Sequence, residues 1–485
     1  MSVEKIPPIR KDISLLVFIT LLIGLVIIIS LLLPLSLNSR SLTYVLVTGL
    51  GFLVFIPLIR RVVNHTFDVA EPCVWFVLFF FAHFGIRAIW DLTFGSPFLE
   101  ISPSSQNFGP VNAALGVSIL ALISYWLGYN NRIGFVFSRS LPNLPSKWNT
   151  KIILPVALIC GVIGWGVRLF LIATQAESIG MWVEAEKDIS LRLTTGMSYF
   201  QNLSILGMVA VFLLYISGRA SSKKRYIFLS ILLFVPELGF ALMTGKRSKM
   251  PFLLLAFLVA YYMTSKRGFK KSKRLFFGTI LVLLLLVALF PLTTSLRLRG
   301  ISGLSETTSS MFAPSQLFYR LGSRLHDLDS LALIMKKVPD QTPHTLGMEL
   351  WVLSVAWIPR QIWPKKPVIV LGKIFYDMVP AGNFPEGTSV SVSLPGQFYW
   401  DLGILGVLLG MIFVGTLWRF LHEYLVKPKR NLSNSLIVSM MFSSFFMPLE
   451  QTLVSLFTHH FFMLVILLVV VLFVSKSRLL LPQER

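Results

Sequence analysis

The sequence predicts an all-α polytopic membrane protein, and three observations lead to this fold class. The 485 residues are 55% hydrophobic, and the mean hydropathy is +0.74. Only 14% of the residues are charged, against roughly 25% in an average soluble chain. Several apolar runs exceed the ~18 residues that can cross a bilayer as a helix. These observations exclude a soluble enzyme and a disordered protein.

We expect about twelve transmembrane helices, separated by short polar or proline-containing segments. In chain order the expected spans are 13–37, 42–59, 72–90, 110–128, 152–175, 197–217, 226–243, 251–264, 275–294, 403–422, 434–449 and 457–475. The chain then divides into three parts. Residues 1–294 hold spans one to nine, residues 295–402 form a large loop, and residues 403–485 hold the last three spans and a tail.

The charge distribution orients these spans. The formal net charge is +22, and the segments on the side of the N-terminus carry almost all of the excess, with 25 basic and 6 acidic residues. The other side carries 16 basic and 15 acidic residues. By the positive-inside rule both termini and the loop 266–274 are cytoplasmic, while 244–249 and 295–402 lie on the outer face. The basicity therefore reflects topology, and no nucleic-acid partner is expected.

The large outer loop begins with a region of helical periodicity. Residues 316–337 predict an amphipathic helix, with Arg320, Arg324 and Asp327 beside its apolar stripe and His326 and Asp329 on the far side. Loops of this length are usually functional. The stripe consists of Phe318, Leu321, Leu325, Leu328, Ala332 and Met335.

The second half of the loop is rich in proline and in aromatic residues. Eight prolines between 339 and 395 prevent long helices, so we expect turns and short helices that lie over the membrane surface. Aromatic rings at headgroup depth anchor such segments, and they also stack on sugar rings. Both roles stay open for Trp357, Trp363, Tyr376 and Tyr399.

Charged residues inside spans are costly in lipid and are usually functional. Four are found, namely Arg87, Arg168, Glu237 and Arg419. Arg87 precedes Asp91 by one helical turn, so a structural ion pair and a ligand site are both open for it. Arg419 lies towards the cytoplasm, where a long side chain can reach the headgroups.

Cations also gather on the outer side, where the positive-inside rule disfavours them. Arginine forks match phosphate oxygens, so these cations predict a phosphate-bearing ligand. Contact with anionic headgroups is the alternative. The cations are Lys246, Arg247 and Lys249 in one turn, Arg297 and Arg299 after span nine, and Arg320, Arg324, Arg360, Lys365 and Lys366 in the large loop.

Other chemistries find no support in the sequence. It contains no HExxH zinc motif, no P-loop and no GxSxG nucleophile motif. The only cysteines, Cys73 and Cys160, lie in apolar runs, which argues against a disulfide framework or a cysteine metal cage. Asp327 and Asp329 would point 200° apart on a helix. We therefore expect neither a metal nor a cofactor.

Four segments resemble one family of membrane enzymes. They are residues 67–72 (FDVAEP), 245–248 (GKRS), 358–367 (IPR…WP…KP) and 395–406 (PGQFYWDLGILG). With the long outer loop, they resemble bacterial Wzy-type oligosaccharide repeat-unit polymerases, which make O-antigen or exopolysaccharide. The resemblance covers most of the chain as architecture, although its motifs are loose.

The resemblance implies a GT-C-type glycosyltransferase of the inner membrane with a periplasmic active site. Such an enzyme joins repeat units carried on undecaprenyl pyrophosphate, and its expected partners are the lipid-linked donor and acceptor, membrane lipids and a chain-length regulator protein. The related O-antigen ligases usually carry a His-Asn pair where this chain has Gln397–Trp400, so a ligase is the second hypothesis. A lipid-linked oligosaccharide flippase is the third.

A lipid pyrophosphate donor supplies its own leaving group, so the enzyme needs cations to stabilise it and a base for the acceptor hydroxyl. We assign leaving-group stabilisation to Arg247, Arg297 and Arg299, with Arg324 and Arg360 assisting. The base stays open among His326, Asp327, Glu306 and Glu386. The wider substrate-binding set is Lys246, Arg320, Arg324, Arg360, Arg87, Arg168, Trp357, Trp363 and Tyr399.

Overall fold

The computed structural model contains helices as its only extended regular structure over the residues that it describes. These residues are 39–64, 66–68, 70–175, 202–243, 249–265, 318–319, 322–355, 358, 362–363, 371–380, 389–428, 431–442, 449–450 and 452–475. The all-α prediction is therefore confirmed for this part of the chain. The predicted spans 13–37 and 275–294 lie outside the described residues.

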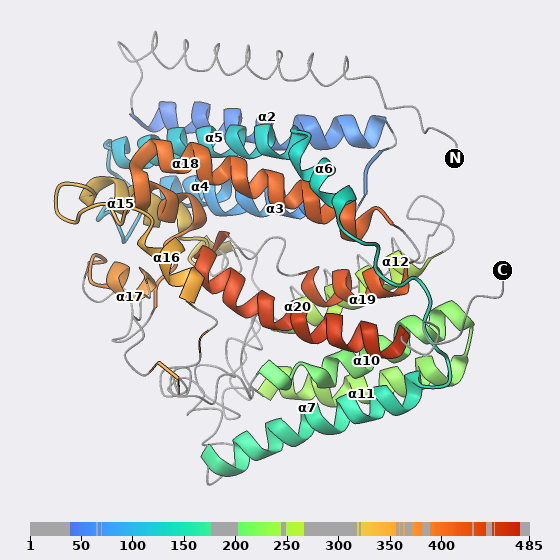
Figure 1. Cartoon of the computed structure of the whole chain (residues 1–485). Helices are drawn as coiled ribbons and strands as arrows, with labels where there is room; N and C mark the ends of the chain where they lie inside the picture. Colours follow the sequence, from blue (N-terminus) through green and yellow to red (C-terminus); the bar gives the residue numbers. More distant parts are fainter. Residues whose placement is uncertain are drawn as a thin grey trace.

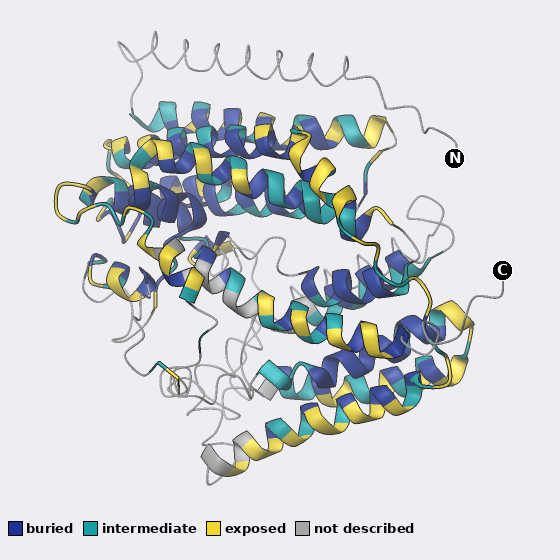
Figure 2. Ribbon diagram, viewed as in Figure 1, coloured by how far each residue is buried: buried dark blue, intermediate teal, exposed yellow. Residues whose placement is uncertain are grey.

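Five of the described helical segments are long and apolar enough to cross a membrane: Ser39–Val63, Pro72–Phe94, Gly109–Asn130, Ile153–Phe170 and Leu394–Val426. Shorter apolar helices cover Leu206–Ser221, Leu253–Thr264, Leu432–Met441 and His460–Ser475. Large apolar side chains also remain exposed along α7 (Ile153–Gln175), as Figure 2 shows, among them Val162 at 73% and Leu169 at 60%. Such surfaces suit lipid rather than water, so the fold is that of a polytopic membrane protein.

The helices form two bundles, which lie one above the other in Figure 1. The first bundle shares one apolar core and consists of α2 (Ser39–Val63), α3 (Pro72–Phe80), η1 (Phe81–Ile86), α4 (Arg87–Phe94), α5 (Gly109–Asn130), α15 (Asp327–Lys337) and α18 (Leu394–Leu421). The second bundle has its own core and consists of α7, α10 (Leu206–Ser221), α11 (Lys224–Met243), α12 (Lys249–Thr264), α19 (Leu432–Met441) and α20 (Leu453–Ser475). Trp75 and Phe79 on α3 pack against both cores and connect the bundles.

Small residues let the helices of each bundle approach closely. A Cβ atom at Gly128 on α5 would overlap the carbonyl of Ile412 on α18, and one at Gly415 would overlap the carbonyl of Tyr125. Helix pairs in membranes depend on such contacts, because lipid offers no hydrophobic drive for association. The α5–α18 pair is therefore closely packed at the centre of the first bundle.

Helix α18 begins at Leu394, nine residues before the predicted start of the tenth span, and reverses direction at Leu402–Gly403. Gly403 has φ 62° and ψ −146°, a conformation that glycine adopts at low cost. The Phe398 ring would lie 2.5 Å from a Cβ atom at Gly410. In a straight helix those residues would be about 18 Å apart. Residues 394–401 thus fold back on the rest of α18, and the predicted boundary at 402/403 falls on the reversal.

The large loop places short helices at one end of the bundles, which we call the α15 end (Figure 1). α16 (Met348–Val355) packs against α20, and α17 (Leu371–Tyr376) lies nearby. The predicted continuous helix 316–337 is wrong in its first half, because Ser323 and Arg324 form a turn and α15 starts at Asp327. A start at this point puts two aspartates in the first turn, where the helix dipole favours negative charge. The remaining described elements are α6 (Ile133–Ser140), at the opposite end, and the π-helical turn η5 (His422–Val426), which follows α18.

Candidate functional site

One face of the α3–η1–α4 segment carries three polar side chains in an otherwise apolar run. His83, Arg87 and Asp91 are spaced four residues apart and are 1%, 2% and 0% exposed. The π-helical turn η1 contains His83, and π-turns within helices are frequent at functional sites. Because polar groups at this spacing share a helix face, this side of the segment must find polar partners in the protein interior.

The first turn of α15 supplies these partners. Oδ2 of Asp327 lies 2.6 Å from Nδ1 of His83, and the carboxylate of Asp329 accepts a hydrogen bond from Arg87. Both aspartates are buried, at 1% and 0% exposed. Leu328 and Leu331 of the same helix are fully buried in the first-bundle core and hold α15 in place. The two aspartates have different partners because residues two apart on a helix point in nearly opposite directions, as the sequence predicts for them.

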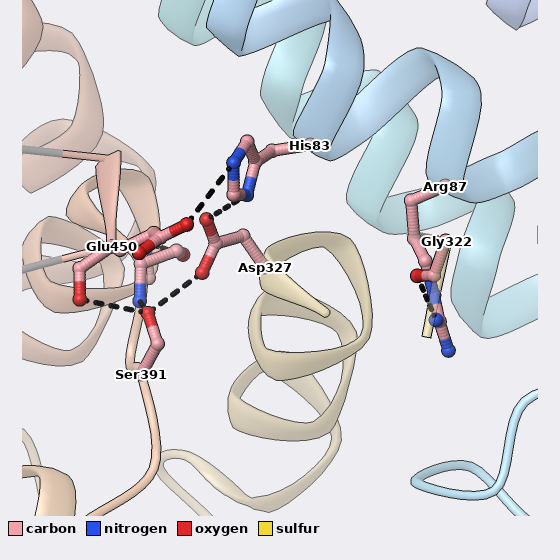
Figure 3. A network of polar contacts seen from close by, with 8 residues as sticks. His83, Arg87, Gly322, Asp327, Ser391 and Glu450 are labelled. Atoms are coloured by element: carbon pink, nitrogen blue, oxygen red, sulfur yellow. Dashed lines mark hydrogen bonds and ion pairs between the residues drawn. The ribbon is translucent and has the colours of Figure 1, made fainter. Parts of the chain in front are cut away.

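Two further groups complete the polar cluster, which Figure 3 shows from close by. Oε1 of Glu450, in the segment before α20, lies 3.4 Å from Nε2 of His83. The hydroxyl of Ser391 lies 2.7 Å from Oδ1 of Asp327 and 3.0 Å from the Glu450 carbonyl oxygen. His83 thus lies between two carboxylates, one from α15 and one from the segment before α20. We call His83, Asp327, Ser391 and Glu450 the His83 cluster.

Exposure differs sharply within the His83 cluster. The side chains of His83 and Asp327 are each 1% exposed, whereas 43% of the Glu450 side chain is accessible. The cluster therefore runs from the protein interior to a surface that an external molecule can reach. Ser391 is partly buried between the two.

Arg87 is held by protein groups. Its Nε lies 3.0 Å from Oδ1 of Asp91, its NH1 donates to the Gly322 carbonyl at 2.8 Å, and its guanidinium lies 4.0 Å from the centre of the Trp90 ring. Together with the bond to Asp329, these contacts enclose a side chain that is 3% exposed. Of the two roles left open for Arg87, the geometry favours the ion pair over a substrate contact.

Two ionisable groups at the α15 end have shifted pKa values. Burial lowers the pKa of His326 to about 4 against the opposing charge of Asp327, so this ring is neutral at pH 7. Partial burial raises the pKa of Glu450 above its ordinary value, and the negative charge of Asp327 raises it further, while the positive charges of His83 and Arg324 act in the opposite direction. Arg324 is exposed in the turn before α15, and its effect on Glu450 brings it into the electrostatic surroundings of the cluster.

The remaining predicted residues fall into two groups. Among the described residues, Tyr399 packs against the first-bundle core, and Trp363 is half-buried. Arg168 on α7 lies in the second bundle, where NH1 is 2.6 Å from Oε1 of Glu237 and the guanidinium is 4.6 Å from the Phe240 ring centre. The residues that lie outside the described part of the chain are Lys246, Arg247, Arg297, Arg299, Glu306, Arg320, Trp357, Arg360 and Glu386.

Sequence reasoning missed His83, Ser391 and Glu450. The signal for His83 was available, because it precedes Arg87 and Asp91 at helical spacing within an apolar run. Ser391 and Glu450 gave no such signal, since each stands in a short polar stretch that resembles many other loops. Within the described residues, no group of three or more His, Cys, Asp or Glu side chains is arranged to hold a metal ion.

Comparison of the chain with protein-family models, with curated proteins and with solved structures finds no match. The interpretation of the site therefore depends on its residues and their geometry.

Proposed function

We propose that the chain is a membrane-embedded glycosyltransferase, in which the large loop closes an acid–base site against the ends of the helices. The observation that carries this proposal is the His83 cluster. It joins a buried imidazole and carboxylate to an accessible carboxylate, in the way that general acid–base sites are built. One membrane helix, two separate segments of the large loop and the segment before α20 contribute to it, so the site exists only when the loop is docked.

More specifically, we propose a polymerase that joins oligosaccharide repeat units carried on undecaprenyl pyrophosphate. The resemblance of residues 245–248, 358–367 and 395–406 to Wzy-type polymerases supports this choice. The donor lipid brings the pyrophosphate leaving group to the membrane surface, where arginines stabilise its developing charge. The charge of Arg324 acts on Glu450 of the cluster, while Arg247, Arg297 and Arg299 are proposed for the same task from the sequence.

The expected topology gives this site a periplasmic position in the inner membrane. Two contacts between distant segments support this topology, because each joins segments that the charge pattern puts on the same side of the membrane. Ser391 contacts Glu450 at the α15 end, which is the proposed periplasmic end. At the other end, the Asn149 amide donates to the carbonyl of Val474. Both termini are proposed to be cytoplasmic.

The test is a polymerisation assay with purified full-length protein and a synthetic lipid-linked repeat unit, in the absence of any nucleotide. We expect a ladder of products that differ by one repeat unit. Asp327→Asn should reduce the ladder at least tenfold, because it removes the charge that faces His83. Asp340→Asn is the matched control, since Asp340 is an exposed acid on the same loop.

The same assay separates the two alternatives. A ligase would give no ladder from the repeat unit alone, but would attach one glycan to an added lipid A–core acceptor. A flippase would give no covalent product with either acceptor, yet would move a labelled lipid-linked oligosaccharide across proteoliposomes. Either result in place of a ladder would overturn the proposed function.

A further inference from the structure

The geometry of the described residues reduces the number of candidates for the base that removes the proton from the acceptor hydroxyl. Asp327 is a poor candidate, since its carboxylate is 1% exposed and already faces His83 and Ser391. His326 is also poor, because its pKa of about 4 makes it a weak proton acceptor at neutral pH. Its ring also packs against Phe98, with ring centres 5.5 Å apart.

Glu450 is both accessible to a substrate and able to accept a proton, unlike Asp327 and His326. Its side chain is 43% accessible, and one of its oxygens faces His83 across 3.4 Å. Two contacts hold the segment that carries it, because the backbone carbonyl of Glu450 accepts from Ser391 and the Leu453 amide donates to the buried Gln397 side chain. A carboxylate that is held in place and still reachable is suited to proton transfer.

We propose that Glu450 is the catalytic base of glycan transfer, and that His83 and Asp327 are positioning residues that act through it. The inference rests on the proposed function. One ring nitrogen of His83 lies beside Asp327 and the other beside Glu450, so the ring links the buried carboxylate to the accessible one. The positive charge at His83 lowers the pKa of Glu450 and so favours its ionised form.

The transfer step balances without a further reagent. The acceptor hydroxyl oxygen forms a bond to the anomeric carbon of the donor glycan, while the bond from that carbon to the pyrophosphate oxygen breaks. The pyrophosphate leaves with the bonding electron pair, and the hydroxyl proton moves to a Glu450 oxygen. Because the side chain is open on one side, the carboxyl then releases the proton to water.

Kinetics of the full-length protein with the synthetic lipid-linked repeat unit test the proposal. Glu450→Gln should lower kcat by roughly 10²–10⁴-fold, with the KM for the lipid substrate within about threefold of wild type. Glu450→Asp keeps a shortened base and should retain more activity than Glu450→Gln. Asp340→Asn, an exposed acid on the same loop, should leave kcat unchanged.

The pH profile of kcat separates proton transfer from a structural role. Wild type should lose activity at low pH as Glu450 becomes protonated, and Glu450→Gln should lack that acidic limb. His83→Asn should move the limb to higher pH, because it removes a positive charge that lowers the pKa of Glu450. A variant that only loosens the fold would lower activity at every pH and leave the limb in place.

The outcomes are distinct for the two proposals. Absence of a ladder with wild type would overturn the proposed function. A wild-type ladder with normal kcat in Glu450→Gln, or with an unchanged acidic limb in that variant, would overturn the role of Glu450 alone. Loss of the limb in Glu306→Gln or Glu386→Gln would also overturn it and would transfer the role to that residue. If Glu450→Gln does not fold, the pH at which kcat falls in Glu450→Asp and in His83→Asn tests the role of Glu450 instead.

Discussion

Arg87 on α4 and Asp329 on α15 are 242 residues apart in the chain and form a buried, hydrogen-bonded ion pair. This pair fixes the loop helix on the membrane helices. Asp327 lies two residues earlier on α15, so the same pair also determines where Asp327 meets His83. The stability of the loop and the geometry of the candidate site are therefore coupled.

Replacement of Arg87 should destabilise the protein strongly. Arg87→Leu leaves the carboxylates of Asp91 and Asp329 buried without their cation, which typically costs about 3–5 kcal/mol. Thermal unfolding in detergent should show a lower Tm than wild type. Arg139→Leu, at an exposed arginine of α6, should change stability by less than about 0.5 kcal/mol.

A triple variant tests the cause of that loss. Replacing Arg87, Asp91 and Asp329 together by leucine removes the orphaned charges, so it should unfold at a higher temperature than Arg87→Leu alone. A wild-type Tm for Arg87→Leu would contradict the structural role of the pair.

Stability should also respond to pH through His326. Its pKa is about 4 in the folded protein and about 6.5 in the unfolded chain, so the unfolded state binds more protons between these values. The contribution of His326 is complete above pH 6.5 and falls by about 3 kcal/mol as the pH drops to 4. Glu450 acts with the opposite sign, because a raised pKa means that the folded state gains protons first.

The difference between wild type and His326→Gln isolates the histidine from that opposing effect. Tm should be measured for both at pH 7.5 and pH 4.5. Wild type should lose more stability than the variant on acidification. Equal losses would show that His326 is not shielded from solvent.

The orientation of the chain can be tested by labelling in spheroplasts. In a variant without Cys73 and Cys160, a cysteine introduced at the exposed Ser104 should react with a membrane-impermeant reagent, and one at the exposed Ser140 should react only after permeabilisation. The +19 and +1 charge excesses on the two sides predict this result. The reverse labelling pattern would contradict both the topology and a periplasmic site.

Polymerisation is expected to proceed in excess chelator. The sequence lacks known metal motifs, and arginines can carry the phosphate charge in place of a divalent cation. The ladder assay with EDTA, compared with an assay without it, measures this. Loss of the ladder that added magnesium or manganese restores would contradict the prediction.

Arg297 is expected to act in the chemistry through its fork of donors. A guanidinium can bind two phosphate oxygens at once, which an ammonium cannot. Arg297→Lys should therefore be nearly as slow as Arg297→Ala, with turnover reduced roughly ten- to a hundredfold at unchanged Tm. Full activity in Arg297→Lys would indicate that the side chain contacts only lipid headgroups.

The sequence by itself determined the class of the protein, because that class depends on local properties. A run of about 18 apolar residues favours a membrane helix wherever it stands. The spacing of Arg87 and Asp91 indicates an ion pair as one of the two roles open for Arg87, since residues four apart share a helix face. Prolines after residue 338 likewise disfavour long helices, and the described helices α16 and α17 of this region have eight and six residues.

Only the tertiary structure decided which polar groups meet. His83, Asp327, Ser391 and Glu450 come from four separate segments, and no periodicity in any one of them specifies the other three. The chain reversal at Gly403 and the late start of α15 at Asp327 bring their segments to the α15 end. Such contacts depend on how whole helices pack and on buried charges finding partners across long stretches of chain. Local sequence patterns therefore identify the helices, while their packing creates the site.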